Sequence, residues 1–290
     1  MTELTTIRQL AERYDTLLFD SYGVLVDEAY GLTGARELID WLESTGKSYY
    51  IVTNDASRSI PSRAGKFIEQ GVPVPEHRII NSGCLIPRFF RNNNLVGAPT
   101  VVFGSPDAYE HVAEGGADIL PHAQLEDADV FVLADDAGYD WRTSMNDLVT
   151  TLNRKILAGE SFKLLLPNPD IIYPSGERAY SFAAAALVDM LESALVRLFG
   201  DDPAYRFTRL GKPFAPIFDE AVRRSSESGA GASFVMIGDQ LETDIAGANA
   251  YGIPSAIVTT GINRLHTTQE LGLLRETVRP VYLLESLSTG

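Results

Sequence analysis

Cysteine, histidine and long apolar runs are all scarce in this chain of 290 residues. The single cysteine, Cys84, excludes an internal disulfide and is typical of proteins from reducing compartments. The four histidines show no spacing that would hold a metal ion. No run approaches the ~18 apolar residues of a membrane span, and the N-terminal residues have no apolar signal core. We therefore expect a cytoplasmic protein with no membrane partner.

Positive charge is also in short supply. The sequence has 24 lysines and arginines against 39 aspartates and glutamates, which gives a formal net charge of −15. This balance argues against nucleic acid or an anionic membrane surface as the main partner. A small anionic substrate remains compatible with it, provided that a local site supplies cations or backbone N–H groups. The share of hydrophobic residues, 45%, is ordinary for a globular protein with a substantial core.

Short apolar runs alternate along the chain with segments of helical spacing. Such runs are typical of strands that are buried on both faces of a parallel sheet, with helices as right-handed crossovers between them. The runs expected to form strands are residues 16–20, 48–53, 100–104, 130–134, 162–166, 233–239, 255–260 and 280–284. The pattern predicts an α/β fold with a doubly wound parallel sheet.

Several of these apolar runs end in a polar residue that a buried strand does not need. Asp20 ends the run TLLFD, Thr53 and Asn54 end the second run, and Asp239 ends the run SFVMIGD. Lys212 stands at the start of a predicted helix. Taken alone, each aspartate or Thr53 could simply be a helix cap, and Lys212 could be a solvated surface lysine. Because ligands of open parallel sheets bind beyond the carboxyl ends of the strands, the set as a whole predicts one site.

Five segments carry motifs, which are FDSYGVLVD (19–27), VTNDASRS (52–59), PNPDIIYP (167–174), LGKP (210–213) and IGDQLETDIAGA (237–248). With these motifs the chain resembles the haloacid dehalogenase (HAD) superfamily, and in particular its NagD-like class IIA. The last motif is specific, whereas LGKP alone is not. The motifs extend over nearly the whole chain, so the resemblance covers both the fold and the site.

The resemblance implies a division of the chain into two domains. Residues 1–96 and 181–290 would form the HAD-like catalytic core, and residues 97–180 an inserted α/β cap domain. A cap of this kind closes over the core site and excludes water during the reaction. Related proteins often pair through their caps, so the resemblance also implies a homodimer. The implied substrate is a small phosphorylated metabolite.

The resemblance also assigns the reacting residues by their position in the motifs. Asp20 matches the nucleophile, whose carboxylate attacks phosphorus and forms an aspartyl-phosphate. Lys212 matches the cation that neutralises both the nucleophile and the phosphate. A bound Mg²⁺ would screen the phosphate charge, and magnesium prefers oxygen ligands. The residues implied to hold it are Asp20, Tyr22 through its backbone carbonyl and Asp239, and Asp244 is implied to hold the water shell of the metal.

Other positions match contacts to the phosphate and the substrate. Thr53 and the backbone N–H of Asn54 match contacts to the phosphate oxygens, together with Lys212. Asp170, in the cap segment PNPD, would either face the substrate or stabilise its own turn, and the sequence leaves both readings open.

The main departure from the family pattern is Tyr22. Family phosphatases carry a second aspartate at this position, two residues after the nucleophile, which protonates the leaving oxygen and later activates water. A phenol ionises near pH ~10, so it can donate a proton but is a poor base at neutral pH. Loss of a general acid typically costs about 10²–10⁴-fold in rate, and substrates with good leaving groups suffer least.

Tyrosine at this position is also the form found in the haloacid dehalogenases, which attack carbon with the same aspartate and use no metal. Asp239 and Asp244 favour the phosphatase reading, because uncompensated carboxylates would repel an anionic haloacid. We therefore predict an enzyme, a magnesium-dependent phosphatase of a small metabolite, with low activity compatible with Tyr22. The alternatives are a nearly inactive or non-catalytic phosphate-ester-binding protein and a haloacid dehalogenase.

Overall fold

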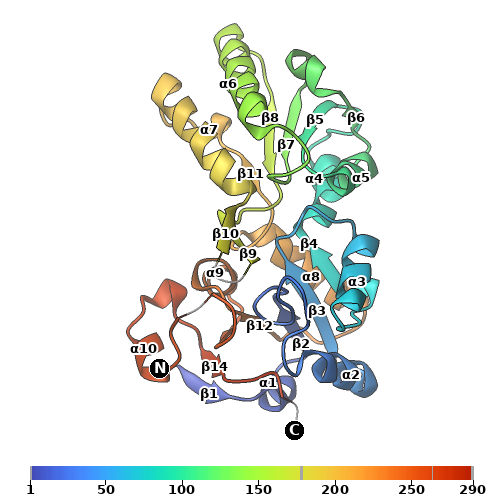
Figure 1. The fold of residues 1–290 in the computed structure, drawn as a ribbon, viewed down its shortest axis with the longest axis vertical. Coiled ribbons are helices and arrows are strands. Elements are labelled where there is room, and N and C mark those ends of the chain that lie inside the picture. The colour runs from blue at the N-terminus through green and yellow to red at the C-terminus, as the bar shows by residue number, and fades with distance from the viewer. Residues whose placement is uncertain (1, 177–178, 263, 289–290) are drawn as a thin grey trace. The chain divides into compact units, whose positions relative to one another are not determined.

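A computed structural model describes residues 2–176, 179–262 and 264–288 (Figure 1). The chain divides into two compact units. The first unit comprises Met1–Thr53, Ile60–Asn81 and Lys212–Gly290, and the second comprises Asn54–Ser59 and Ser82–Gly211. None of the described helices has the length and apolar character needed to cross a membrane.

A parallel sheet forms the centre of the first unit, and seven of its strands lie among the described residues. Their order across the sheet is β1 (Glu3–Thr5), β14 (Tyr282–Leu284), β13 (Ser255–Val258), β12 (Phe234–Gly238), β2 (Thr16–Phe19), β3 (Ser48–Thr53) and β4 (Ile79–Asn81). The chain winds outward from β2 in both directions, so the order reverses between β2 and β12. In sheets of this kind, the crevice beyond such a reversal is where ligands bind.

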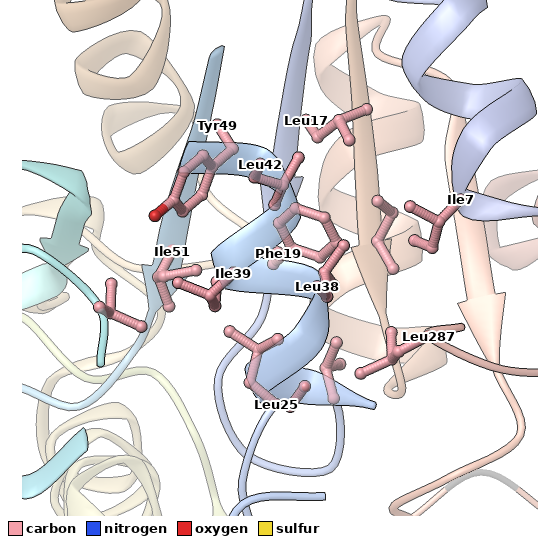
Figure 2. Packing of buried hydrophobic residues seen from close by; sticks show 14 of the residues in the cluster. Ile7, Leu17, Phe19, Leu25, Leu38, Ile39, Leu42, Tyr49, Ile51 and Leu287 are labelled. Atoms are coloured by element: carbon pink, nitrogen blue, oxygen red, sulfur yellow. The ribbon is translucent and has the colours of Figure 1, made fainter. Parts of the chain in front are cut away.

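Helices of the first unit bury apolar side chains against this sheet. The helices are α1 (Ile7–Arg13), α2 (Ala35–Thr45), α3 (Ile60–Glu69), α8 (Ala215–Glu227), α9 (Ala246–Tyr251) and α10 (Thr268–Gly272), with short turns η1 (Glu76–Arg78), η5 (Leu241–Ile245) and η6 (Glu276–Val278). Figure 2 shows Leu38 and Leu42, four residues apart on α2, packed near Phe19 of β2. Each fully buried side chain of this size contributes about 1.5–3 kcal/mol to folding, so this core keeps the strands in register.

The second unit has its own parallel sheet. The order of its strands is β11 (Thr208–Arg209), β8 (Lys163–Leu166), β7 (Val130–Leu133), β5 (Pro99–Phe103) and β6 (Asp118–Ile119). A separate antiparallel hairpin joins β9 (Ile172–Gly176) to β10 (Ala179–Phe182). Its helices are α4 (Ile86–Asn92), α5 (Pro106–Glu114), α6 (Trp141–Ala158) and α7 (Ala184–Phe199), with short turns η2 (Ser82–Leu85), η3 (His122–Asp127) and η4 (Pro203–Tyr205).

Two parallel sheets with crossover helices confirm the predicted α/β class. The predicted cap spanned residues 97–180, whereas the second compact unit spans residues 54–59 and 82–211. The physical reason is packing. The apolar face of α7 is part of the core of the second unit, together with Phe131 of β7 and Leu148 of α6.

The register of the first sheet sets the position of its polar strand ends. Phe19 of β2 lies beside Ile237 of β12 on one side and beside Ile51 of β3 on the other. The residues that follow these strands therefore lie along the same carboxyl edge of the sheet.

Candidate active site

A buried lysine lies between two carboxylates of the first unit. The Nζ atom of Lys212 is 2.6 Å from Oδ1 of Asp20 and 2.7 Å from Oδ1 of Asp244. The exposed fractions of these side chains are only 2%, 8% and 0%. Burying a charge is costly unless it is paired and hydrogen-bonded, so the three side chains depend on one another.

Asp239 adds a third buried carboxylate. One carboxylate oxygen from each of Asp20, Asp239 and Asp244 lies within 4.8 Å of the others. Oδ2 of Asp239 accepts a hydrogen bond from the backbone N–H of Ile262 at 2.8 Å. Its Oδ1 is buried and has no hydrogen-bond partner in the part of the chain that the structure describes. Three carboxylates against one lysine leave an excess of negative charge in the cluster.

The pKa values of the cluster reflect this crowding. Burial, together with repulsion from Asp244, raises the pKa of Asp20 to about 7, although Lys212 acts in the opposite direction. Burial and the charges of Asp244 and Asp20 also raise the pKa of Asp239 well above its ordinary value. Burial opposes the charge of Lys212, yet the two carboxylates outweigh it and raise the lysine pKa. A divalent cation among the carboxylates would relieve their mutual repulsion.

The donor set of this cluster fits a hard cation. Mg²⁺ takes oxygen ligands from one or two carboxylates and keeps several water molecules, and the three aspartates of this cluster offer carboxylate oxygens. The buried Oδ1 atom of Asp239 is a free ligand position of the required kind. The residues present therefore fit the predicted magnesium ion.

Local backbone geometry lets two loops close on Asp239. Gly23 and Gly261 both have positive φ, +76° and +79°, which L side chains rarely adopt. A Cβ atom at either position would come within 2.4 Å or 2.1 Å of Oδ2 of Asp239. Sequence reasoning missed Gly261, although its position directly after the apolar run 255–260 was a usable signal. The hydrogen bond from the backbone N–H of Ile262 to Asp239 could not be predicted from the sequence.

Thr53 is the last residue of the neighbouring strand β3, and Asn54 follows it directly. Thr53 is buried and lies opposite Asn81 of β4 in the first unit. In the second unit, Nδ2 of Asn54 donates a hydrogen bond to Oδ1 of Asp170 at 2.9 Å, and its backbone carbonyl accepts one from Ser82 at 2.7 Å. The structure thus brings Asn54 and Asp170 together.

Asp170 also has a local contact in its own turn. Its backbone N–H donates to the side-chain oxygen of Asn168 at 3.0 Å, which is an Asx turn. The carboxylate of Asp170 therefore holds Asn54 while the backbone of the same residue closes the turn.

Tyr22 makes its contacts away from the carboxylates. Its hydroxyl oxygen accepts a hydrogen bond from Nη1 of Arg63 at 3.1 Å, and the guanidinium carbon lies 4.7 Å from the centre of its ring. Among the described residues, the phenol has no hydrogen bond with Asp20, Lys212 or Asp239. Sequence reasoning missed Arg63, because a single arginine on an amphipathic helix is indistinguishable from a surface residue.

The comparison with known families agrees with the fold. Residues 17–118 match the family described as haloacid dehalogenase-like hydrolase, and residues 209–289 match a second family described as HAD-hydrolase-like. Together the two matches cover more than half of the chain. The chain therefore belongs to the haloacid dehalogenase-like hydrolases, in the NagD-like class, and it is a hydrolase, as the sequence predicted.

The chain is also similar to individual phosphatases. The chain is 29% identical over 279 residues to the glycerol-3-phosphate phosphatase of Gallus gallus, which covers 90% of this chain and 84% of the relative. It is 27% identical to the crystal structure of a possible sugar phosphatase from Cytophaga hutchinsonii, with a TM-score of 0.83 and 99% of each chain covered.

A second similar structure is that of a glycerol phosphate phosphatase from Mycobacterium tuberculosis in complex with magnesium. The identity is 25% and the TM-score 0.75, and the match covers 96% of this chain and 77% of that one.

Proposed function

We propose that this protein is a magnesium-dependent phosphatase that hydrolyses a small phosphorylated metabolite through an aspartyl-phosphate on Asp20. The observation that carries the proposal is the buried cluster in which Lys212 contacts Asp20 and Asp244 while an oxygen of Asp239 has no partner among the described residues. The phosphatases among the relatives, one of them in complex with magnesium, support the same reaction.

In this proposal, carboxylate oxygens of Asp20 and Asp239 and the backbone carbonyl of Tyr22 would hold Mg²⁺, and Asp244 would hold the water shell of the ion. When bound, the ion supplies positive charge that screens the phosphate from the carboxylates. Lys212 also supplies positive charge at the site. Because Lys212 is in contact with Asp20, it favours the ionised carboxylate that nucleophilic attack requires.

The reaction consists of two displacements at phosphorus. An oxygen of Asp20 forms a bond to phosphorus while the bond from phosphorus to the leaving oxygen breaks. A water oxygen then bonds to phosphorus while the bond from phosphorus to Asp20 breaks, which restores the carboxylate and releases inorganic phosphate. One proton of the water stays on the phosphate, and the other balances the negative charge of the leaving group. Thr53 and the backbone N–H of Asn54 would contact the phosphate oxygens.

The leaving oxygen carries negative charge unless a proton reaches it. Tyr22 occupies the position of the usual acid, but its hydroxyl is in contact with Arg63. We therefore expect the enzyme to favour substrates whose leaving groups depart without a proton from the protein, such as acyl or aryl phosphates. We also propose that the second unit is the cap domain. The cytoplasmic location and the homodimer remain predictions from the sequence.

The test is a panel of phosphate esters and acyl phosphates, assayed with and without magnesium on wild type, Asp20→Asn and Asp40→Asn. Asp40 is exposed on α2 and provides the same chemical change away from the cluster. We expect hydrolysis that requires magnesium, is lost in Asp20→Asn and is retained in Asp40→Asn.

Three outcomes would contradict the proposal. Full hydrolysis by Asp20→Asn would remove Asp20 as the nucleophile. Halide release from haloacids in the presence of chelator would favour the dehalogenase alternative. Tight binding of phosphate esters without turnover would favour the non-catalytic alternative.

A further inference from the structure

We propose that Arg63 is a positioning residue, which holds the two residues after the nucleophile and keeps the phenol of Tyr22 from acting as a proton donor to the leaving group. This inference deepens the proposed function and rests on it. The preference for phosphates with good leaving groups, expected above from Tyr22, would then depend on this one buried arginine.

Arg63 lies on α3 with its side chain fully buried. Its Nη2 atom donates a hydrogen bond to the hydroxyl of Ser21, and its Nη1 atom donates to the hydroxyl of Tyr22. The guanidinium also lies between two aromatic rings, 4.7 Å from the centre of Tyr22 and 4.3 Å from that of Phe67. A buried guanidinium requires such partners, because its hydration has been lost.

The contacts of Arg63 hold the segment Ser21–Tyr22, which directly follows the nucleophile. Ser21 and Tyr22 come directly after Asp20, and both of their hydroxyls are bound by the same guanidinium. On the other side, Gly23 approaches Asp239 so closely that a side chain there would overlap its carboxylate. A shift of this segment would therefore move Asp20, and a displacement of about 1 Å can cost ~10²-fold in rate.

The same contacts restrain the phenol itself. The ring of Tyr22 is packed against the core of the first unit as well as against the guanidinium. To reach a leaving group elsewhere, the ring would have to give up the hydrogen bond from Arg63 and the stacking contact together. Its hydroxyl makes no hydrogen bond to Asp20 among the described residues. A leaving group must then depart without a proton from Tyr22, which favours acidic leaving groups.

A series of aryl phosphates whose leaving phenols differ in acidity tests this directly. The variants are Arg63→Met, Arg63→Lys and Tyr22→Phe, with Arg78→Met as the matched control. Arg78 is also largely buried in the first unit, and its guanidinium lies 4.8 Å from the ring of Tyr49, but it contacts no residue of the charge cluster in the described chain. For each variant, kcat, KM, the thermal midpoint Tm and the Kd for magnesium alone are measured.

We expect Arg63→Met to lower kcat by about 10–100-fold for substrates with good leaving groups, with partial rescue in Arg63→Lys. The loss should be smaller for poor leaving groups, because the released phenol can then donate its proton. The slope of log kcat/KM against leaving-group pKa reports the departure of the leaving group, and it should be the same in wild type and Tyr22→Phe because the phenol proton is not used. Arg78→Met should lower Tm without lowering kcat. Magnesium should bind more weakly to Arg63→Met than to Arg78→Met, a readout that does not depend on turnover.

The inference is overturned if Tyr22→Phe selectively slows the substrates with poor leaving groups, because the phenol would then be the acid. It is also overturned if Arg63→Met and Arg78→Met lower Tm equally and leave kcat and magnesium affinity equally intact. Asp20→Asn in the same series separates the two proposals. Activity retained in Asp20→Asn overturns the proposed function, whereas activity lost in Asp20→Asn but unchanged in Arg63→Met overturns only the role of Arg63.

Discussion

The two parallel sheets of this protein each present a carboxyl group of raised pKa shortly after a central strand. Asp20 follows β2 in the first unit, and Asp135 follows β7 in the second. The pKa of each is raised to about 7, and in both cases burial is the largest cause.

The surroundings of these two carboxyls differ in one respect that decides the chemistry. Asp20 contacts Lys212, and the carboxylates of Asp239 and Asp244 lie close by. Asp135 has neighbouring acids, Asp136 and Asp55, which raise its pKa further, and no ion pair reaches it in the described residues. A raised pKa therefore does not by itself define a site. The buried lysine keeps several carboxylates together and leaves one of them able to bind a cation.

The largest difference between the two units should be the effect on kcat of replacing Asp20 or Asp135 by asparagine. We expect Asp20→Asn to lower kcat at least about 10³-fold, because the nucleophile is lost, and Asp135→Asn to change it only a few-fold. Steady-state kinetics with an aryl phosphate measure both. Equal losses in the two variants would show that Asp135 also takes part in catalysis, contrary to the difference inferred between the two carboxyl groups.

Removal of Lys212 should lower the stability of the folded protein, because the carboxylates of the first cluster lose their partner. Lys212→Met leaves buried carboxylates without their cation, and breaking a buried pair in this way typically costs about 3–5 kcal/mol. The control is Lys155→Met in the second unit, where the lysine is also buried but its partner Glu160 is 55% exposed and stays solvated. Urea unfolding at neutral pH should show the smaller loss for Lys155→Met, and the reverse order would contradict the dependence of the first cluster on Lys212.

Magnesium should stabilise the first cluster selectively. At a concentration of ~100 Kd, a ligand that binds only the folded state adds about 2.7 kcal/mol of stability, which raises Tm by several degrees. We expect this rise in wild type and Asp135→Asn, and a much smaller rise in Asp239→Asn, which removes the carboxylate with the partnerless oxygen. Thermal scans with and without chelator give the comparison. The same rise in all three proteins would place the ion elsewhere.

The smallest effect concerns the pH dependence of the second cluster. The pKa of Asp135 is about 7 in the folded state against an ordinary value of 3.8, so the folded state binds the proton more tightly. Stability from this group is present below about pH 4 and is lost as the pH rises toward ~7. Asp135→Asn should therefore stabilise the protein by ~1 kcal/mol at about pH 8 and have little effect near pH ~4. Urea unfolding at the two pH values measures this, and an equal effect at both would mean that the pKa of Asp135 is not raised.

Much of the fold and the charge cluster could be predicted from the sequence, because both depend on local patterns. An apolar run such as TLLF indicates a strand buried on both faces, and a polar residue directly after it lies at the carboxyl edge of the sheet. That rule identified Asp20, Asp239 and Lys212 as parts of one site, and the motif resemblance added Asp244. The family and the hydrolase class followed from the same segments.

The partners of these residues were harder to predict. Arg63 binds Tyr22 across 41 positions of the chain, and Asn54 binds Asp170 across 116. Neither pair leaves a periodic signal, because a hydrogen bond between distant segments depends on how their helices and strands pack.

The sequence by itself therefore determined the α/β class, the parallel strands and the positions of the acids at the strand ends, since burial and chain direction follow from residue order. Only the tertiary structure decided that Lys212 lies between Asp20 and Asp244 and that Tyr22 faces a buried arginine. The physical reason is that the energy of a buried charge depends on the groups around it in space, and folding brings those groups from distant parts of the chain.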